Sequence, residues 1–74
     1  MDATRLLERA RAMRSLPDAA ERRRLREQAG LTLAEVAELI GVDRSTVHRW
    51  EHAGALRGER AGDYARLIEQ LAAA

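Results

Sequence analysis

The chain has 74 residues, a formal net charge of +1 and no cysteine, so we expect one small domain, residues 1–74, without disulfides or thiolate metal sites. With only two histidines and no completing ligand we expect no metal and no cofactor, and without a signal peptide or an apolar run near the ~20 residues that span a bilayer we expect a cytoplasmic protein. The charge is uneven, since residues 31–43 hold three acids and no base, so the domain is not a generic polycation that coats nucleic acid.

The first predicted helix covers residues 3–15. Apolar side chains recur there at the three- and four-residue spacing of one helix face: Ala3, Leu6, Leu7, Ala10 and Met13. Pro17 stops this helix. Asp18 and Glu21 have the spacing of a capping box and start a second helix, which ends at Gly30.

Two short amphipathic helices follow, joined by a tight corner. Thr32 is the predicted N-cap of the first, and Glu35 three residues later completes a capping box. The apolar face of this helix is formed by Leu33, Val36, Ala37 and Ile40. Gly41 ends the helix, because only glycine adopts a positive φ there without a steric penalty. Asp43 or Ser45 can cap the next helix.

The C-terminal third of the chain contains one more helix. Residues 53–60 are predicted to form a loop that carries Arg57 and Arg60. The helix that follows has its apolar side chains on one face: Ala61, Tyr64, Ala65, Ile68, Leu71 and Ala72. No segment has the alternating pattern of a strand, so the sequence predicts an all-α, five-helix bundle.

The predicted helix over residues 44–53 separates polar from apolar side chains. At about 100° per residue, its polar side chains fall within an arc of roughly 140°: Arg44, Ser45, His48, Arg49 and His52. Val47 and Trp50 point the opposite way, so we expect them in the core. A helix that hides Val and Trp and presents Arg, Ser and His suits the major groove of DNA, which admits one α-helix.

The stretch LREQAGLTLAEVAELIGVDRSTVHRWE, with the helix-turn-helix motif at residues 32–51, resembles the phage repressor and Cro type of protein, the XRE family. The resemblance covers about residues 19–72 and rests on Arg26, Gly30, Leu31, Thr32, Ala37, Gly41, Val42, Arg44, Ser45, Thr46, Val47, Arg49, Trp50 and Glu51. It implies a lambda-repressor-like bundle, here with an extra N-terminal helix and without the usual fifth helix at the C-terminus. The chain departs from the family at Leu33, where a Gln usually helps to hold a phosphate, and at Arg22, where an apolar residue is usual.

The resemblance and the polar arc together predict a DNA-binding set: Thr32, Arg44, Ser45, Thr46, His48, Arg49, His52, Arg57 and Arg60. The helix that starts at Arg44 is expected to read bases, while Thr46 braces that helix or touches phosphate. Thr32 acts as a cap or at a phosphate. Arg57 and Arg60, in the predicted loop, are expected to contact the DNA backbone.

Other prominent side chains are expected to have structural roles. The arginine run at residues 22–24 is expected to form a solvated helix face from which one side chain can reach a phosphate. The resemblance implies that Arg26 and Glu51 pair across the fold and lock two helices together. Trp50 and Tyr64 are expected to pack in the core.

The leading hypothesis is a sequence-specific regulator that binds double-stranded DNA, a small Cro-like repressor from a phage or an actinobacterium. The organism follows from the Arg- and Ala-rich composition, which is typical of GC-rich genomes. The alternative is an antitoxin or another protein-binding module that autoregulates through the same motif. An enzyme with a small-molecule substrate is rejected, because the sequence holds no nucleophile and base, no paired acids, no phosphate loop and no metal set.

One recognition helix reads only a few base pairs, so we expect two copies to bind a two-fold-related site. The apolar stripe of residues 3–15 has two possible destinations. It folds back on its own domain, against Leu67 and Leu71, or it forms a dimer interface. We favour the fold-back, because a small domain needs the core, and expect a monomer or a weak homodimer in free solution.

Overall fold

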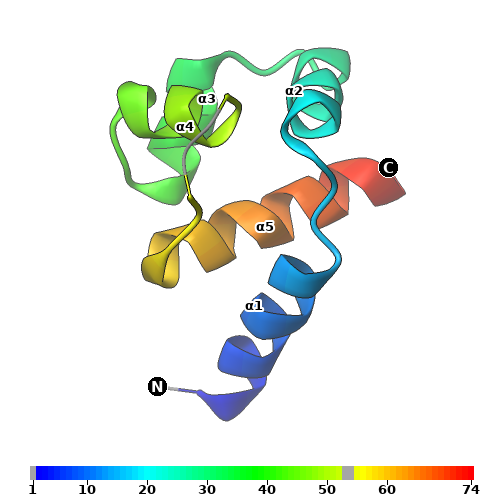
Figure 1. Cartoon of the computed structure of the whole chain (residues 1–74), viewed down its shortest axis with the longest axis vertical. Coiled ribbons are helices and arrows are strands. Elements are labelled where there is room, and N and C mark those ends of the chain that lie inside the picture. Colours follow the sequence, from blue (N-terminus) through cyan, green and yellow to red (C-terminus); the bar gives the residue numbers. More distant parts are fainter. Residues whose placement is uncertain (1, 53–54) are drawn as a thin grey trace.

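The computed structural model describes residues 2–52 and 55–74, and this part of the chain consists of five helices and their connections without a strand (Figure 1). The helices are α1 (Ala3–Arg14), α2 (Ala19–Gln28), α3 (Leu33–Ile40), α4 (Arg44–Trp50) and α5 (Gly58–Ala73). The predicted all-α bundle is thus confirmed. Over the described residues, none of the helices has the length and apolar character needed to cross a bilayer.

The predicted start and stop signals of the two central helices are confirmed. Thr32 Oγ1 accepts from the Glu35 backbone N–H at 3.0 Å, and the Glu35 carboxylate accepts from the Thr32 N–H at 2.8 Å, which is the reciprocal capping box. Gly41 ends α3 with φ of 90°, a conformation that disfavours any residue with a Cβ. Asp43 is the N-cap of α4, although its side chain makes no capping hydrogen bond.

The capping box predicted at the start of α2 is only half formed. Asp18 accepts from the Glu21 N–H at 2.9 Å. The Glu21 carboxylate turns instead to the guanidinium of Arg24, with contacts of 2.6 and 2.7 Å. A charge-assisted pair one turn along the same helix is the stronger partner for this carboxylate.

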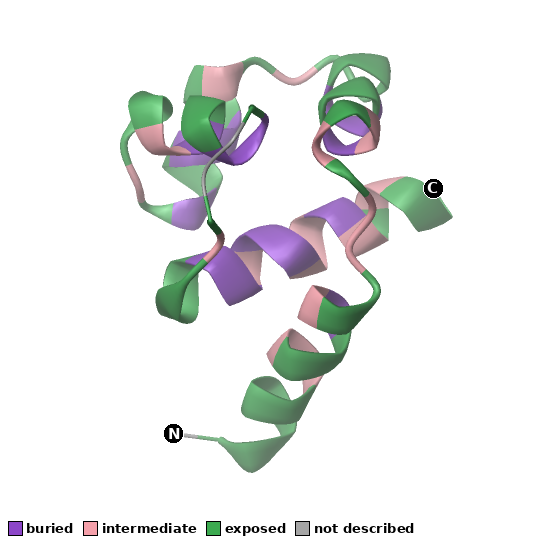
Figure 2. Ribbon diagram, in the orientation of Figure 1, coloured by how far each residue is buried: buried purple, intermediate pink, exposed green. Residues whose placement is uncertain are grey.

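The core lies where α2, α3 and α4 meet one face of α5 (Figure 2). Tyr64 and Ile68 of α5 are fully buried, together with Val47 of α4. The rings of Trp50 and Tyr64 lie 4.8 Å apart between centroids in a tilted arrangement, a geometry that favours aromatic pairs. The predicted core positions of Trp50 and Tyr64 are therefore confirmed.

Helix α1 folds back on α5, as expected, but the face that makes the contact differs from the prediction. Ala12 is its one buried residue, with Arg9, Met13 and Leu16 half-buried beside it. The predicted stripe is mostly outside: Ala3, Leu6, Leu7 and Ala10 are exposed. Helix α1 lies along the α5 face that carries Ala65 and Ile68, whereas Leu71 lines a groove next to α2; the expected contacts of α1 with Leu67 and Leu71 stay predictions.

Ion pairs explain why α1 turned this face inward. Arg9 lies between two carboxylates of α5, at 2.8 Å from Asp63 and 3.2 Å from Glu59. Its stem packs on Gly62, where an added Cβ would come within 3.0 Å of the Arg9 side chain. Two further pairs connect the same helices: Arg11–Glu69 and Glu8–Arg66. The ion pairs thus orient α1 so that most of its apolar stripe is exposed rather than buried.

Two predicted boundaries around the recognition helix are corrected. Helix α4 ends at Trp50 rather than continuing to residue 53; residues 53–54 lie outside the described part. Helix α5 begins at Gly58, so residues 58–60 are helical rather than part of the predicted loop. Gly58 has φ of 84°, and this turn lets the chain enter α5 earlier than the apolar pattern suggested.

Candidate nucleic-acid interface

One face of helix α4 packs in the core, and the opposite face is exposed to solvent. Val47 is completely buried and Trp50 is 4% exposed, and both belong to the main core. Arg44, Ser45 and His48 are exposed on the outer face of the same helix. The predicted division between the buried and the polar side of this helix is therefore confirmed, and it leaves a rigid helix with a hydrogen-bonding face in solvent.

Three arginines on α4 and at the start of α5 differ in their partners from most other arginines of the described chain, although Arg5, Arg14 and Arg22 are likewise outside any ion pair among the described residues. Most arginines of the described chain form ion pairs with carboxylates: Arg9, Arg11, Arg23, Arg24, Arg26, Arg60 and Arg66. Within residues 2–52 and 55–74, no such pair involves Arg44, Arg49 or Arg57. Their guanidinium groups keep all donors for an external acceptor, and the planar fork suits guanine or phosphate.

The two histidines form a stacked pair at the end of α4. Their ring centroids are 4.1 Å apart with an angle of 21° between planes. Nδ1 of His52 lies 2.7 Å from the His48 carbonyl oxygen. A carbonyl only accepts, so Nδ1 carries the proton and Nε2 of His52 is left as the outward-facing nitrogen. Both rings are exposed, as are Arg44 and Arg49.

The other residues of α3 and α4 that were predicted to contact DNA are exposed or half-buried. Ser45 is exposed in the first turn of α4, and Thr46 is half-buried beside it. The Oγ1 and N–H of Thr32 both serve the capping box. An anion at the start of α3 would therefore meet the other first-turn N–H groups as well as the Thr32 hydroxyl proton.

Arg57 and Arg60 are separated by the early start of α5. Arg57 is the exposed N-cap residue of the helix. Arg60 lies in its first turn and pairs with Asp63 at 3.5 Å. Its guanidinium covers the α3–α4 corner, since a Cβ on Gly41 would be 3.7 Å from Arg60 Cζ. The expectation that both arginines occupy a loop was wrong for Arg60.

Arg22 is not part of a solvated arginine face, which corrects the interpretation of the run at residues 22–24. It is 8% exposed. One terminal nitrogen donates to the Pro17 carbonyl and the other donates to the Trp50 carbonyl at 2.7 Å. Arg23 and Arg24 are exposed, as expected. The available signal for Arg22 was its place in the apolar register of α2, where the family usually has a hydrophobic residue.

The predicted pair between Arg26 and Glu51 is confirmed and is buried. Arg26 Nε and Nη2 donate to the two Glu51 oxygens at 2.6 and 3.0 Å, and the Glu51 side chain is 1% exposed. The hydrogen bonds that Arg26 donates to Glu51 raise the pKa of the Arg26 guanidinium above its ordinary value. A third bond, from Arg26 Nη1 to the Leu31 carbonyl at 2.8 Å, fixes the connection into α3.

Tyr64 completes the polar cluster under the recognition helix. Its hydroxyl and Arg22 Nε are buried without a hydrogen-bond partner. Burial raises the pKa of the Tyr64 phenol, the nearby charge of Glu51 raises it further, and Arg22 acts in the opposite direction. This phenol is held neutral beneath α4, where it supports the helix rather than reacting.

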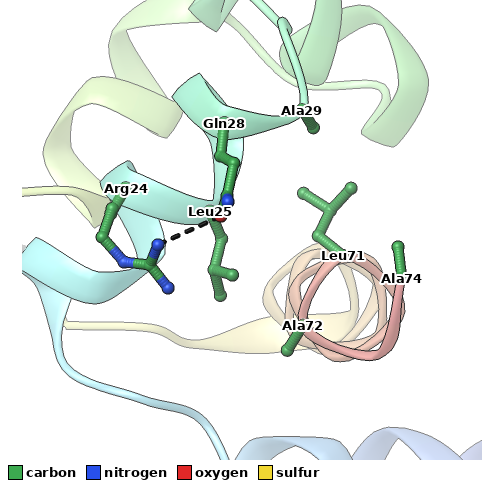
Figure 3. A pocket seen from close by; sticks show the side chains of 7 residues that line it. All are labelled: Arg24, Leu25, Gln28, Ala29, Leu71, Ala72 and Ala74. Atoms are coloured by element: carbon green, nitrogen blue, oxygen red, sulfur yellow. Dashed lines mark hydrogen bonds between the residues drawn. The ribbon is translucent and has the colours of Figure 1, made fainter.

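A surface groove lies between α2 and the end of α5, and Leu25 and Leu71 point into it (Figure 3). The polar side chains that line this groove are Arg24 and Gln28, and Arg24 donates a hydrogen bond to Gln28 at 3.0 Å. Across residues 2–52 and 55–74, no three His, Asp or Glu side chains gather in a way that could hold a metal ion.

The family model described as Helix-turn-helix matches residues 23–72, which runs from the second half of α2 through almost all of α5. No curated protein and no solved structure shows significant similarity to the chain. The match begins after α1, in agreement with the sequence argument that the N-terminal helix is an addition. This family's domain is a DNA-binding regulatory domain. The chain belongs to the XRE family of helix-turn-helix proteins and is a DNA-binding transcription regulator of that type.

Proposed function

We propose that the protein is a small Cro-like repressor that recognises a specific operator with α4 in the major groove. The observation that carries the proposal is the contrast among arginines. Arg44 and Arg49 project from a helix whose other face is fixed in the core, and they have no carboxylate partner within the described chain. Such arginines bind guanine edges or phosphates without first losing an internal partner.

The predicted contacts fall into two classes. Arg44, Ser45, His48 and Arg49 read base edges, because they share the exposed arc of α4. The second class positions the domain on the phosphate backbone: Thr32, Thr46, His52, Arg57 and Arg60. In this class Arg60 must leave a weak pair at 3.5 Å, so we expect it to contribute less than Arg57.

Repression is the simplest regulatory role for a DNA-binding domain, because it requires only that the domain occupy a promoter. Two copies bind a two-fold-related site with their α4 helices in successive major grooves, about 34 Å apart. Free in solution, the protein is a monomer or a weak dimer.

Selection of bound sequences from a random DNA pool tests the proposal and gives the half-site spacing. Arg44→Ala and Arg49→Ala should each cost about 1–3 kcal/mol and relax one base position. Arg57→Ala should weaken all sequences alike and lower the salt slope by about one unit. Arg11→Ala is the matched control, because this exposed arginine lies on α1, outside the helix-turn-helix motif, and pairs with Glu69. Unchanged site preference and affinity in both Arg44→Ala and Arg49→Ala would contradict the proposal.

A further inference from the structure

Exposed large apolar side chains occur at two places on the described chain. Leu6 and Leu7 lie on α1, with 52% and 69% of their surface exposed, and Leu39 lies on α3 with 66% exposed. Isolated exposed leucines need no explanation, but here each site has apolar neighbours. Both sites are outside the polar face of α4.

The site on α1 is an exposed helix-packing stripe, of which Leu6 and Ala10 also border a shallow groove next to Gly58, Glu59 and Gly62 of α5. Ala3, Leu7, Ala10 and Arg14 recur at intervals of four, three and four residues, which aligns them on one side of a helix. This side is opposite Ala12, the one residue of α1 that is buried. Figure 2 shows the N-terminal half of the helix exposed all round. We call these four residues, with Leu6 at their edge, the α1 stripe.

The site on α3 is a shallow groove of opposite charge. It is lined by Leu31, Glu35, Glu38 and Leu39, which we call the α3 groove. The segment of residues 31–43 has three acids and no base, whereas residues 1–30 have a net charge of +3. Among the described residues no ion pair involves Arg14 or Glu38.

The two surfaces cannot satisfy each other within one molecule. Helix α1 is held against α5, and α3 lies on the other side of α5 (Figure 1). A second copy of the chain offers what each surface lacks: leucines for leucines and a carboxylate for Arg14. Pairing the α1 stripe with another α1 stripe would instead bring two Arg-rich helices together, and like charges disfavour that arrangement.

We infer that the protein self-associates head to tail, with the α1 stripe of one copy in the α3 groove of the next. Leu6 and Leu7 pack against Leu31 and Leu39, and Arg14 pairs with Glu38. Each interface is a single helix against a shallow groove, so association is weak and salt-sensitive. This inference concerns protein contacts alone and holds whether or not the proposed operator binding is correct.

Sedimentation of the full chain without DNA, from micromolar to millimolar concentration, tests the inference. Leu7→Asp removes the stripe and Leu39→Asp removes the groove, and each should weaken self-association at least about tenfold. Gln70→Asp is the matched control, since Gln70 is exposed on α5 and outside both surfaces. Circular dichroism checks that each variant is folded.

Mixing the two variants gives the decisive result. Leu7→Asp keeps its α3 groove and Leu39→Asp keeps its α1 stripe, so the mixture should form a one-to-one heterodimer although neither variant associates alone. Arg14→Glu and Glu38→Arg should each weaken association, and the double variant should restore it. A wild-type chain that stays monomeric, a mixture that stays monomeric, or association that survives both leucine changes would overturn the inference.

Discussion

The two sides of α5 are attached by different physical means. Toward α2, α3 and α4 it presents Ala61 and Tyr64, which are fully buried in a shared core. Toward α1 the packing is extensive but less completely buried: Ala12 is the only buried residue of that helix, Met13 and Leu16 are half-buried, and ion pairs add several contacts. One of these pairs, Arg11–Glu69, has side chains 59% and 33% exposed.

The difference separates the DNA-binding unit from its addition. Burial of apolar area dominates folding free energy, whereas exposed ion pairs contribute little and weaken in salt. The family match at residues 23–72 coincides with the well-buried side. We therefore expect α1 to open at lower free energy than the rest of the chain, and the following predictions test that ranking.

The largest effect should follow Glu51→Ala. This change strands the Arg26 guanidinium at a site where its side chain is 10% exposed. Losing one partner of a buried pair costs about 3–5 kcal/mol, a large share of the stability of so small a domain. Thermal unfolding should show a sharp fall in Tm, with DNA affinity lost only as the protein unfolds. A variant that melts like wild type would show that the pair is not structural.

A smaller loss should follow Arg22→Ala. Removing the guanidinium leaves the Pro17 and Trp50 carbonyls without their donor, and an unsatisfied buried polar group costs about 1–3 kcal/mol. Arg22→Met fills more of the space and should recover part of that loss. Chemical denaturation measures both variants. Equal stability of wild type and Arg22→Ala would mean that water replaces the guanidinium without cost.

Gly62→Val should affect the α1 side selectively. The new Cβ would stand 3.0 Å from Cβ and Cδ of Arg9, so α1 must move away. Overpacking costs about 1–3 kcal/mol, and the better helix propensity of a non-glycine residue offsets part of it, so the global loss should be near 1 kcal/mol. Hydrogen exchange should speed up across α1 while the amides of α3 and α4 keep their protection. Uniform acceleration along the whole chain would show that the two sides unfold together.

The smallest effect should appear at low pH, and it concerns α3, on the side of α5 away from α1. The Thr32 N–H holds the pKa of the Glu35 carboxyl below its ordinary value of 4.5. The folded chain therefore binds fewer protons than the unfolded chain in this range, so stability is present above the ordinary pKa and is lost as pH falls through the folded one. Glu35→Gln keeps an acceptor but cannot titrate, so its Tm should fall less between pH 5 and pH 3 than that of wild type. Parallel curves for the two proteins would contradict this assignment.

Local chemistry made the DNA-binding unit predictable. The Thr32–Glu35 box, the Gly41 corner and the opposite faces of α4 each follow from residues close in sequence, and the structure confirms all three. The burial of Trp50 followed in the same way from helical periodicity. The DNA contacts proposed for that surface remain predictions.

Contacts between distant residues explain the errors. Apolar spacing predicted that Leu7 and Ala10 would face inward, but Arg9 has carboxylates 50 and more positions away that the pattern does not include. The charge run predicts a solvated position for Arg22. Its two carbonyl acceptors belong to a linker and to the end of α4, so the local sequence of α2 does not reveal them. Periodicity reports what a helix hides from water, and it misses a charge whose partner is supplied by another helix.

The position of Trp50 has an optical consequence. It is the only tryptophan of the chain, and the only tyrosine, Tyr64, lies 4.8 Å away from it. Light absorbed by Tyr64 is therefore emitted from Trp50, whose indole sits in an apolar site under the recognition helix and fluoresces at short wavelength. Separation of the two rings ends the transfer and shifts the emission to the red. Release of α1 leaves the rings in place, so the unlabelled protein carries a spectroscopic probe that responds to opening of one side of α5 and not the other.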